Sequence, residues 1–356
     1  MKKLIAILSL ALSLCLLAGC MGTPVVYYCD CPTDGQVDNT PNTDNNTTEL
    51  PEGALKTGLA IVANAKDSTS VVDETNGEAK YDVTIVAVLV DDNGVIRSCI
   101  IDSIGASVKF DGNGVITSDL SAAVLTKNEL GDSYGMKAYG GAKYEWYEQA
   151  AALADFAVGK TMDELKNGAV GADGKAVDVD LASTATIYLG GYVSAIEKAV
   201  ANAQHLGAQS GDVLKLASIN SIASSANAGE KNGTAQLDVD VTAITMKGDV
   251  ITSCYIDSLQ AKVSFDVAGG IASDISATFA TKNELGENYG MKAWGGATYE
   301  WNEQAASFAS YVTGKTAAEV AGIAVTETTA PADVDLSATV TIAIGGFQAL
   351  IAKAAK

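Results

Sequence analysis

The stretch TKNELGDSYGMKAYGGAKYEWYEQAA (residues 126–151) recurs almost unchanged as TKNELGENYGMKAWGGATYEWNEQAA (residues 281–306). The offset between the copies is 155 residues, and 25 of the 36 positions that start at Thr126 are identical in the second copy. The same offset relates Cys99 to Cys254 farther upstream. Solenoid repeats have shorter units, of roughly 20 to 50 residues. The sequence therefore predicts that one whole domain is duplicated in tandem.

Each copy is predicted to begin with strands and to end with helices. Alternating apolar runs separated by Asp- and Gly-rich turns are typical of antiparallel strands. In the first copy such runs lie at residues 81–90, 95–104, 106–110 and 115–120. The Thr126-x-x-Glu129 spacing indicates a capping box at a helix start, and further helices are expected over 144–159, from Thr161 and over 192–203. Strands followed by a separate group of helices indicate an α+β fold, here two tandem homologous domains, each an antiparallel sheet with helices packed on it.

The 356 residues divide into four predicted segments. They are a lipoprotein signal peptide at residues 1–19, a disordered polar stalk at 20–55, repeat 1 at 56–204 and repeat 2 at 210–356. The stalk is predicted because its many Asp, Asn, Thr and Pro residues leave too little apolar surface to offset the entropy of ordering. Each repeat is long enough to bury a sizeable core.

The N-terminus has the basic, apolar and small-residue regions of a secretory signal. The apolar run that follows Lys2 and Lys3 is too short to span a membrane. The tetrapeptide LAGC that ends at Cys20 resembles the bacterial lipobox. This resemblance implies that Cys20 carries a lipid and anchors the chain in the bilayer, at the extracellular face of the cell membrane. The alternative is an ordinary signal peptide in which the cysteine is incidental.

The chain is acidic, with 43 acidic and 23 basic side chains and a formal net charge of −20. This balance argues against nucleic acid as a partner, because phosphate binding needs clustered cations and the only arginine is Arg97. The only histidine, His205, lies between the repeats. A catalytic site shared by both copies therefore excludes Ser-His-Asp and Cys-His arrangements. No metal site is expected, since a shared one would have to be built from carboxylates alone.

The carboxylates and cysteines that both copies share are interpreted as structural. Glu145 and Glu148 are spaced i, i+3 on one helix face, and a solvated face is the favoured interpretation. Cys99 and Cys254 occupy equivalent places on alternating strands, where buried free thiols are expected.

The repeated passage also contains a segment rich in aromatic residues and glycine. Glycines let backbone approach a flat ligand closely, and aromatic rings supply a stacking face. Core packing is the alternative explanation for each ring taken singly. The candidate ligand-binding residues are Tyr134, Met136 and Tyr139 in repeat 1, and Tyr289, Met291 and Trp294 in repeat 2.

A second shared element is DLASTATIYLGG (residues 180–191), with the copy DLSATVTIAIGG (residues 335–346). Small residues surround Thr186 and Thr341, which would keep each hydroxyl accessible to a modifying enzyme. The Gly-Gly pair that follows opens a helix, whose unpaired N–H groups and positive dipole end suit a phosphate. The alternative interpretation is a β-strand of alternating threonines that leads into a helix.

This second element resembles Asp-x-x-Ser-Gly-Ala-Thr, the segment through which FMN-binding domains of bacterial electron transfer carry a flavin covalently. Repeat 1 matches at Asp180, Ser183 and Thr186, with a threonine in the place of the glycine. Repeat 2 keeps Asp335 and Thr341 but lacks the serine and the alanine. Together with the lipobox, the stalk and the repeated passage, this makes the chain similar to the flavin-carrying surface lipoproteins of Gram-positive extracellular electron transfer.

The resemblance implies FMN bound covalently, by a phosphoester to Thr186 and Thr341. A separate flavin transferase that uses FAD would attach it, so the chain would need no catalytic triad of its own. Electrons would pass from a quinone-linked donor in the membrane to an external acceptor such as ferric iron. The protein would then be a redox carrier rather than an enzyme with its own catalytic groups.

Two other functions stay open at the level of sequence. A non-redox surface module that binds a small molecule or a wall component would use the same glycines and aromatic rings. A purely structural spacer on the cell surface would need neither. The attachment point is also open, because Thr184 and Thr339 lie two residues from the matched threonines.

Overall fold

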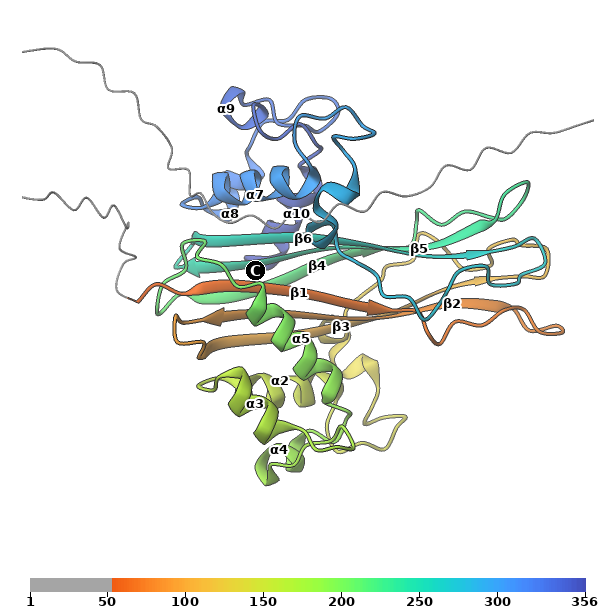
Figure 1. Ribbon diagram of the computed structural model, residues 1–356, viewed down its shortest axis with the longest axis horizontal. Helices are drawn as coiled ribbons and strands as arrows, with labels where there is room; N and C mark the ends of the chain where they lie inside the picture. Colours follow the sequence, from red (N-terminus) through yellow and green to blue (C-terminus); the bar gives the residue numbers. More distant parts are fainter. Residues whose placement is uncertain (1–52) are drawn as a thin grey trace, which may run out of the picture. The chain divides into compact units, whose positions relative to one another are not determined.

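The structure, a computed structural model, describes residues 53–356, and each repeat in it forms a three-stranded antiparallel sheet with helices packed on one face (Figure 1). This confirms the predicted α+β fold with two tandem homologous domains. The predicted signal peptide, Cys20 and residues 20–52 of the predicted stalk lie outside the described residues. The prediction ends the stalk at residue 55, but Leu55 is buried and its N–H donates to the Ala208 carbonyl at 2.9 Å. The folded part therefore begins before Lys56.

The strands of both repeats pair in chain order. Repeat 1 contains β1 (Lys56–Asn64), β2 (Gly77–Val90) and β3 (Ile96–Phe110), and repeat 2 contains β4 (Val213–Ser221), β5 (Gly233–Lys247) and β6 (Val250–Phe265). The turn between β2 and β3 is held by Asp91, whose carboxylate accepts two backbone N–H groups of the turn at 2.9 Å each. Gly94 completes this turn with a φ of +78°, a conformation that favours glycine.

Two details of the predicted strands are wrong. The runs at 95–104 and 106–110 form the single strand β3, because Gly105 pairs with Asp82 without interrupting the ladder. The run at 115–120 is not a strand, since only Ile116 forms an isolated bridge, to Phe110. Ile116 and Leu120 instead pack, partly buried, against the core between the sheets, whereas Val115 is exposed.

Helices follow the strands in both repeats. Repeat 1 contains α1 (Lys127–Leu130), the 3-10 helix η1 (Gly131–Tyr134), α2 (Trp146–Ala157), α3 (Met162–Ala169), α4 (Val179–Thr184) and α5 (Gly190–Ala201). Repeat 2 contains α6 (Lys282–Leu285), η2 (Gly286–Tyr289), α7 (Trp301–Val312), α8 (Ala317–Ala321), α9 (Val334–Ser337) and α10 (Gly345–Ala354). The predicted capping box is confirmed: Thr126 Oγ1 accepts the Glu129 N–H at 3.2 Å, and Glu129 Oε2 accepts the Thr126 N–H at 2.9 Å.

The two sheets pack against each other face to face. One core cluster combines buried residues of both sheets, among them Tyr81, Ile85, Leu237 and Val239. The opposite face of each sheet is covered by helices of its own repeat, so the order of layers is helix, sheet, sheet, helix (Figure 1). The central strands β2 and β5 are therefore buried on both faces, which explains continuous apolar runs such as IVAVLV at residues 85–90.

The contacts between the repeats are reciprocal. Phe110 and its equivalent Phe265 stack with ring centroids 4.0 Å apart and an interplanar angle of 3°. Lys198 of repeat 1 pairs with Glu284 of repeat 2 at 2.7 Å, and Lys353 of repeat 2 pairs with Glu129 of repeat 1. The glutamates are those of the two capping boxes. The repeats thus associate through the same surface patches, as subunits of a symmetric dimer do.

Candidate functional site

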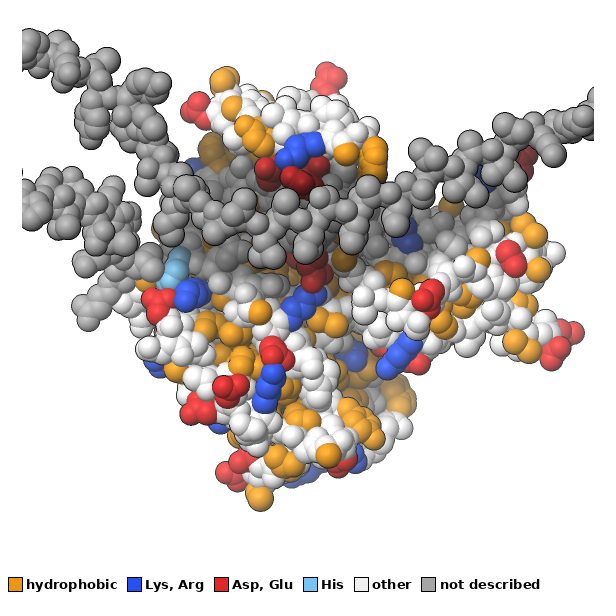
Figure 2. Space-filling view, viewed as in Figure 1, with side chains coloured by type: hydrophobic (Ala, Val, Ile, Leu, Met, Phe, Trp, Pro, Cys, Tyr) orange, Lys and Arg blue, Asp and Glu red, His pale blue; other side chains and the backbone are white. Residues whose placement is uncertain are grey.

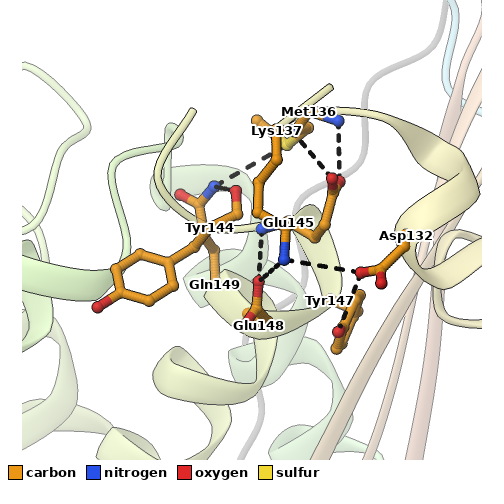
Figure 3. Close-up of polar contacts among 8 residues, drawn as sticks. All are labelled: Asp132, Met136, Lys137, Tyr144, Glu145, Tyr147, Glu148 and Gln149. Carbon is orange, nitrogen blue, oxygen red and sulfur yellow. Dashed lines mark hydrogen bonds and ion pairs between the residues drawn. The ribbon is translucent and has the colours of Figure 1, made fainter. Parts of the chain in front are cut away.

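The loop that contains Tyr-Gly-Met-Lys is held by a buried glutamate in repeat 1 (Figure 3). Glu145, which is 1% exposed, accepts the Met136 N–H at 2.8 Å and the Lys137 N–H at 2.9 Å through its two carboxylate oxygens. Its own N–H donates to Glu148 at 2.7 Å. The Glu145 N–H and then Lys137 hold the pKa of Glu148 below its usual value. The prediction of a solvated face is therefore wrong for Glu145, because backbone donors replace its water.

Gln149 lies one helical turn beyond Glu145 and joins the loop to the threonine segment. It is fully buried. Its Oε1 accepts the Thr186 N–H at 2.8 Å, the Thr186 hydroxyl at 3.1 Å and the Ile187 N–H at 3.1 Å. Its Nε2 donates to the Tyr144 carbonyl at 3.0 Å and lies 3.9 Å from Met136 Sδ. One side chain thus brings together two predicted site residues, Thr186 and Met136.

Repeat 2 has the same arrangement. Gln304 Oε1 accepts the Thr341 N–H at 2.8 Å and the Thr341 hydroxyl at 3.2 Å, and its Nε2 lies 3.9 Å from Met291 Sδ. Glu300 accepts the Met291 N–H at 2.8 Å, as Glu145 does for Met136. Sequence reasoning missed both glutamines. Their signal was present, since Glu-Gln-Ala-Ala is identical in the two copies of the repeated passage.

The two candidate threonines are exposed and precede a helix start that no side chain caps. Thr186 lies between α4 and α5, and Thr341 lies between α9 and α10. No side-chain hydrogen bond caps α5 at Leu189, and a Cβ on Gly190 or Gly191 would have no atom within 4 Å. Within the described residues, the start of α5 is therefore uncapped by side chains and sterically open, four residues after Thr186. The alternative interpretation of a strand of alternating threonines is wrong, because residues 180–191 contain no strand.

Tyr139 and Trp294 are exposed rings that lie over a glycine. They are 91% and 82% exposed. A Cβ on Gly135 would lie 2.5 Å from the Tyr139 ring, and one on Gly290 would lie 2.2 Å from the Trp294 ring. Each ring therefore rests on backbone with its other face open to solvent. This is the close approach that only glycine permits.

Tyr134 and Tyr289 each lie beside a lysine of their own repeat. The Lys127 ammonium lies 5.1 Å from the centroids of both the Tyr134 and the Trp146 rings. Lys282 lies in the same way 5.1 Å from the Tyr289 ring. Both tyrosines thus bind a lysine of their own repeat by a cation–π contact.

Asp180 and Asp335, the acidic residues that match the flavin-attachment segment, do not cap helices α4 and α9. Asp178 caps α4, and its carboxylate accepts the Asp180 N–H at 3.0 Å. Asp180 is exposed, and Ser183 Oγ donates to its backbone carbonyl at 2.7 Å. In repeat 2 the cap is Asp333, and Asp335 is exposed. The carboxylates of Asp180 and Asp335 are therefore exposed to solvent, and each lies six residues before its candidate threonine in the sequence.

Both ends of the molecule carry exposed apolar side chains near these segments. Val179, the first residue of α4, and Val334, the first residue of α9, are largely exposed. Figure 2 shows apolar side chains at the lower tip and at the upper tip, where Figure 1 places α4 and α9. Charges of both signs are scattered between them over the face shown.

The shared cysteines are free thiols, as predicted. Cys254 is buried and Cys99 is partly buried. Burial raises the pKa of each thiol to about 12, so neither is a thiolate at neutral pH. His205 Nε2 lies 3.0 Å from Asp92 Oδ1. Neither residue belongs to the sequence segments around Thr186 and Thr341.

Comparisons with protein-family models, with curated proteins and with solved structures found no match to this chain. Across residues 53–356, no three His, Cys, Asp or Glu side chains come together in a way that would hold a metal ion. Over the same range, no helix has the length and apolar character needed to cross a membrane.

Proposed function

We propose that this protein is a surface-anchored flavoprotein electron carrier, with FMN attached through its phosphate to Thr186 and to Thr341. The observation that carries the proposal is the pair of exposed threonines, each fixed by a buried glutamine that also contacts the Tyr-Gly-Met-Lys loop. The sequence around each threonine resembles a flavin-attachment segment, and the glutamine would hold the attachment point in both repeats.

The residues around each threonine fit a flavin phosphate. Esterification removes the hydroxyl hydrogen and with it one bond to Gln149, but the Thr186 and Ile187 N–H groups keep their acceptor. The open start of α5 offers N–H groups and a positive dipole end to the phosphate. Tyr139 in repeat 1 and Trp294 in repeat 2 present an open aromatic face against which a flat ring can stack.

The flavin would supply the redox chemistry, and the protein would supply position and electrostatics. A flavin transferase would use FAD as donor, with the Thr oxygen forming the new bond to the FMN phosphorus and AMP leaving with the proton. The resemblance in sequence further supports a quinone-linked donor in the membrane, an external acceptor such as ferric iron, and a lipid anchor at Cys20. All of these partners belong to the proposal.

The intact mass of protein produced together with a flavin transferase tests the proposal. One flavin phosphate is expected per repeat, and Thr186→Val and Thr341→Val are each expected to remove one. Loss of label in Thr184→Val or Thr339→Val instead would move the attachment point by two residues. An unmodified mass under these conditions, with a ligand that is lost on dialysis, would favour the non-redox binding module.

A further inference from the structure

The two candidate attachment sites carry different charges. Each site comprises the repeated passage and the threonine segment with the loop before it. The repeat 1 site contains residues 126–151 and 170–191, and the repeat 2 site contains residues 281–306 and 325–346. Both sites contain seven acidic residues, but the repeat 1 site has four lysines and the repeat 2 site has two. Their formal net charges are therefore −3 and −5.

The two additional lysines of the repeat 1 site are Lys143 and Lys175. Their equivalents at the offset of 155 residues are Thr298 and Ala330. Both lysines are exposed, and within residues 53–356 neither forms a salt bridge. Lys137, by contrast, has a glutamate carboxylate 3.2 Å from its ammonium. No carboxylate of the described residues thus balances the two additional charges by direct contact.

Lys175 lies on a loop that is bonded to the residues after Thr186. The Leu189 N–H donates to the Gly174 carbonyl at 2.7 Å. The Lys175 ammonium lies 5.8 Å from the centroid of the Tyr188 ring, two residues after the candidate threonine. The loop therefore holds a cation beside the attachment point of repeat 1.

The equivalent loop of repeat 2 keeps its place but lacks the cation. The Ile344 N–H donates to the Thr329 carbonyl at 2.8 Å, which is the same backbone bond as in repeat 1. Ala330 and Ala343 stand where repeat 1 has the lysine and the tyrosine. The backbone arrangement thus matches, and the charge differs.

Lys143 is also close to the group that holds the threonine. Its ammonium lies 4.8 Å from the centroid of the Tyr144 ring. The carbonyl of Tyr144 accepts the Nε2–H of Gln149 at 3.0 Å, and Gln149 binds the threonine segment. In repeat 2 the Tyr299 carbonyl accepts from Gln304 at 2.9 Å, but a threonine precedes this tyrosine. The same polar contact therefore occurs there without the neighbouring charge.

A cation close to a flavin favours the reduced state. Reduction by two electrons with uptake of one proton adds one negative charge to the ring, and a nearby positive charge stabilises it. At a separation on the order of 10 Å and an effective dielectric constant of about 40 to 80, one charge changes this equilibrium about 2- to 4-fold. Two lysines together would change it about 4- to 16-fold, which is about 20 to 35 mV for a two-electron couple.

We propose that Lys143 and Lys175 give the repeat 1 site a higher reduction potential than the repeat 2 site, so that electrons shared between the two flavins collect in repeat 1. This inference rests on the proposed function. The same cofactor would occupy both sites, so the electrons and protons that one flavin gives up are those that the other takes up. No further reactant is needed for this exchange.

Redox titration of proteins that carry a single flavin tests the inference. Thr341→Val leaves only the repeat 1 site and Thr186→Val only the repeat 2 site, and the intact mass first establishes that each protein carries one flavin phosphate. The potential of the repeat 1 site is expected to be about 20 to 35 mV higher at low ionic strength. The difference should shrink in 1 M salt, where the Debye length is about 3 Å.

Exchanging the lysines between the repeats separates their charge from other differences between the two sites. Lys143→Thr with Lys175→Ala should lower the repeat 1 potential. Thr298→Lys with Ala330→Lys should raise the repeat 2 potential by a similar amount. None of the four side chains is buried, and each new residue is the one found at the equivalent position of the other repeat, so the fold should be retained.

Three results from proteins that carry flavin would overturn the inference alone. They are equal potentials of the two sites, a difference that the lysine exchange leaves unchanged, and a difference that salt does not reduce. A protein whose mass shows no flavin after production with the transferase would contradict the proposed function itself, and this inference with it. The intact mass therefore distinguishes the two kinds of failure.

Discussion

Replacing Gln149 by leucine is expected to release the Thr186 segment from helix α2. The substitution keeps the volume of the buried side chain but removes the acceptor of two N–H groups and one hydroxyl. Each hydrogen bond contributes a net stabilisation of about 1 kcal/mol. Because Thr186 is exposed, water can replace part of the hydrogen bonding that the substitution removes. The free energy that opposes local opening should therefore fall by about 2 to 3 kcal/mol.

Amide hydrogen exchange measures this change directly. A loss of about 2 to 3 kcal/mol corresponds to exchange about 30- to 150-fold faster at Thr186 and Ile187. The equivalent amides at Thr341 and Ile342 serve as an internal control, because Gln304 still holds them. Under the proposed function, flavin loading should also fall at Thr186 alone. Unchanged exchange at Thr186 and Ile187 would refute the role given to Gln149.

Two further predictions concern groups in repeat 2. Burial raises the pKa of Asp257 to about 6, so the folded state keeps this proton to higher pH than the unfolded state, and the free energy of unfolding should fall as pH rises from about 4 to about 6. Asp257→Asn should reduce that slope in denaturant titrations, and an identical slope would contradict the assignment. Gly290→Ala requires a φ of +84° and places a Cβ 2.2 Å from the Trp294 ring, so it should destabilise the fold by about 1 to 3 kcal/mol and alter tryptophan fluorescence. Gly296→Ala, with a φ of +66° and no atom within 4 Å, should show the backbone strain alone, and equal effects of the two on fluorescence would argue against the ring contact.

The helix starts were predictable because their signals are local, and the duplication was predictable because the sequence repeats itself at a constant offset. Thr126 and Glu129 are three residues apart, and that spacing alone determines the capping box. The strand expected at residues 115–120 failed for the opposite reason. An apolar run there looks like a strand, but it forms a single isolated bridge to Phe110, and the Ile116 N–H donates instead to the Asn227 side chain at 2.8 Å.

The packing of one repeat on the other could not be read from the sequence. The continuous apolar run at residues 85–90 shows that both faces of β2 are buried, but it does not say what covers the second face. The burial of Glu145 could not be predicted from the sequence either. The cost of burying its carboxylate is offset by the Met136 and Lys137 N–H groups, which the bend of the chain at Gly135 brings to it. Gln149 could not be found in this way, because Thr186 and Ile187, which donate to its Oε1, lie 37 and 38 residues farther along the chain.

The reciprocal contacts between the repeats have a consequence for the origin of the chain. Phe110 stacks on its own equivalent, and each capping glutamate pairs with the lysine of the other copy. A protein with a single repeat would present the same self-complementary surface and would assemble as a homodimer. Fusion makes that assembly independent of concentration. It also frees each half to change by itself, which a homodimer encoded by one sequence cannot do, and the equivalent positions 147 and 302, a tyrosine and an asparagine, show one such difference.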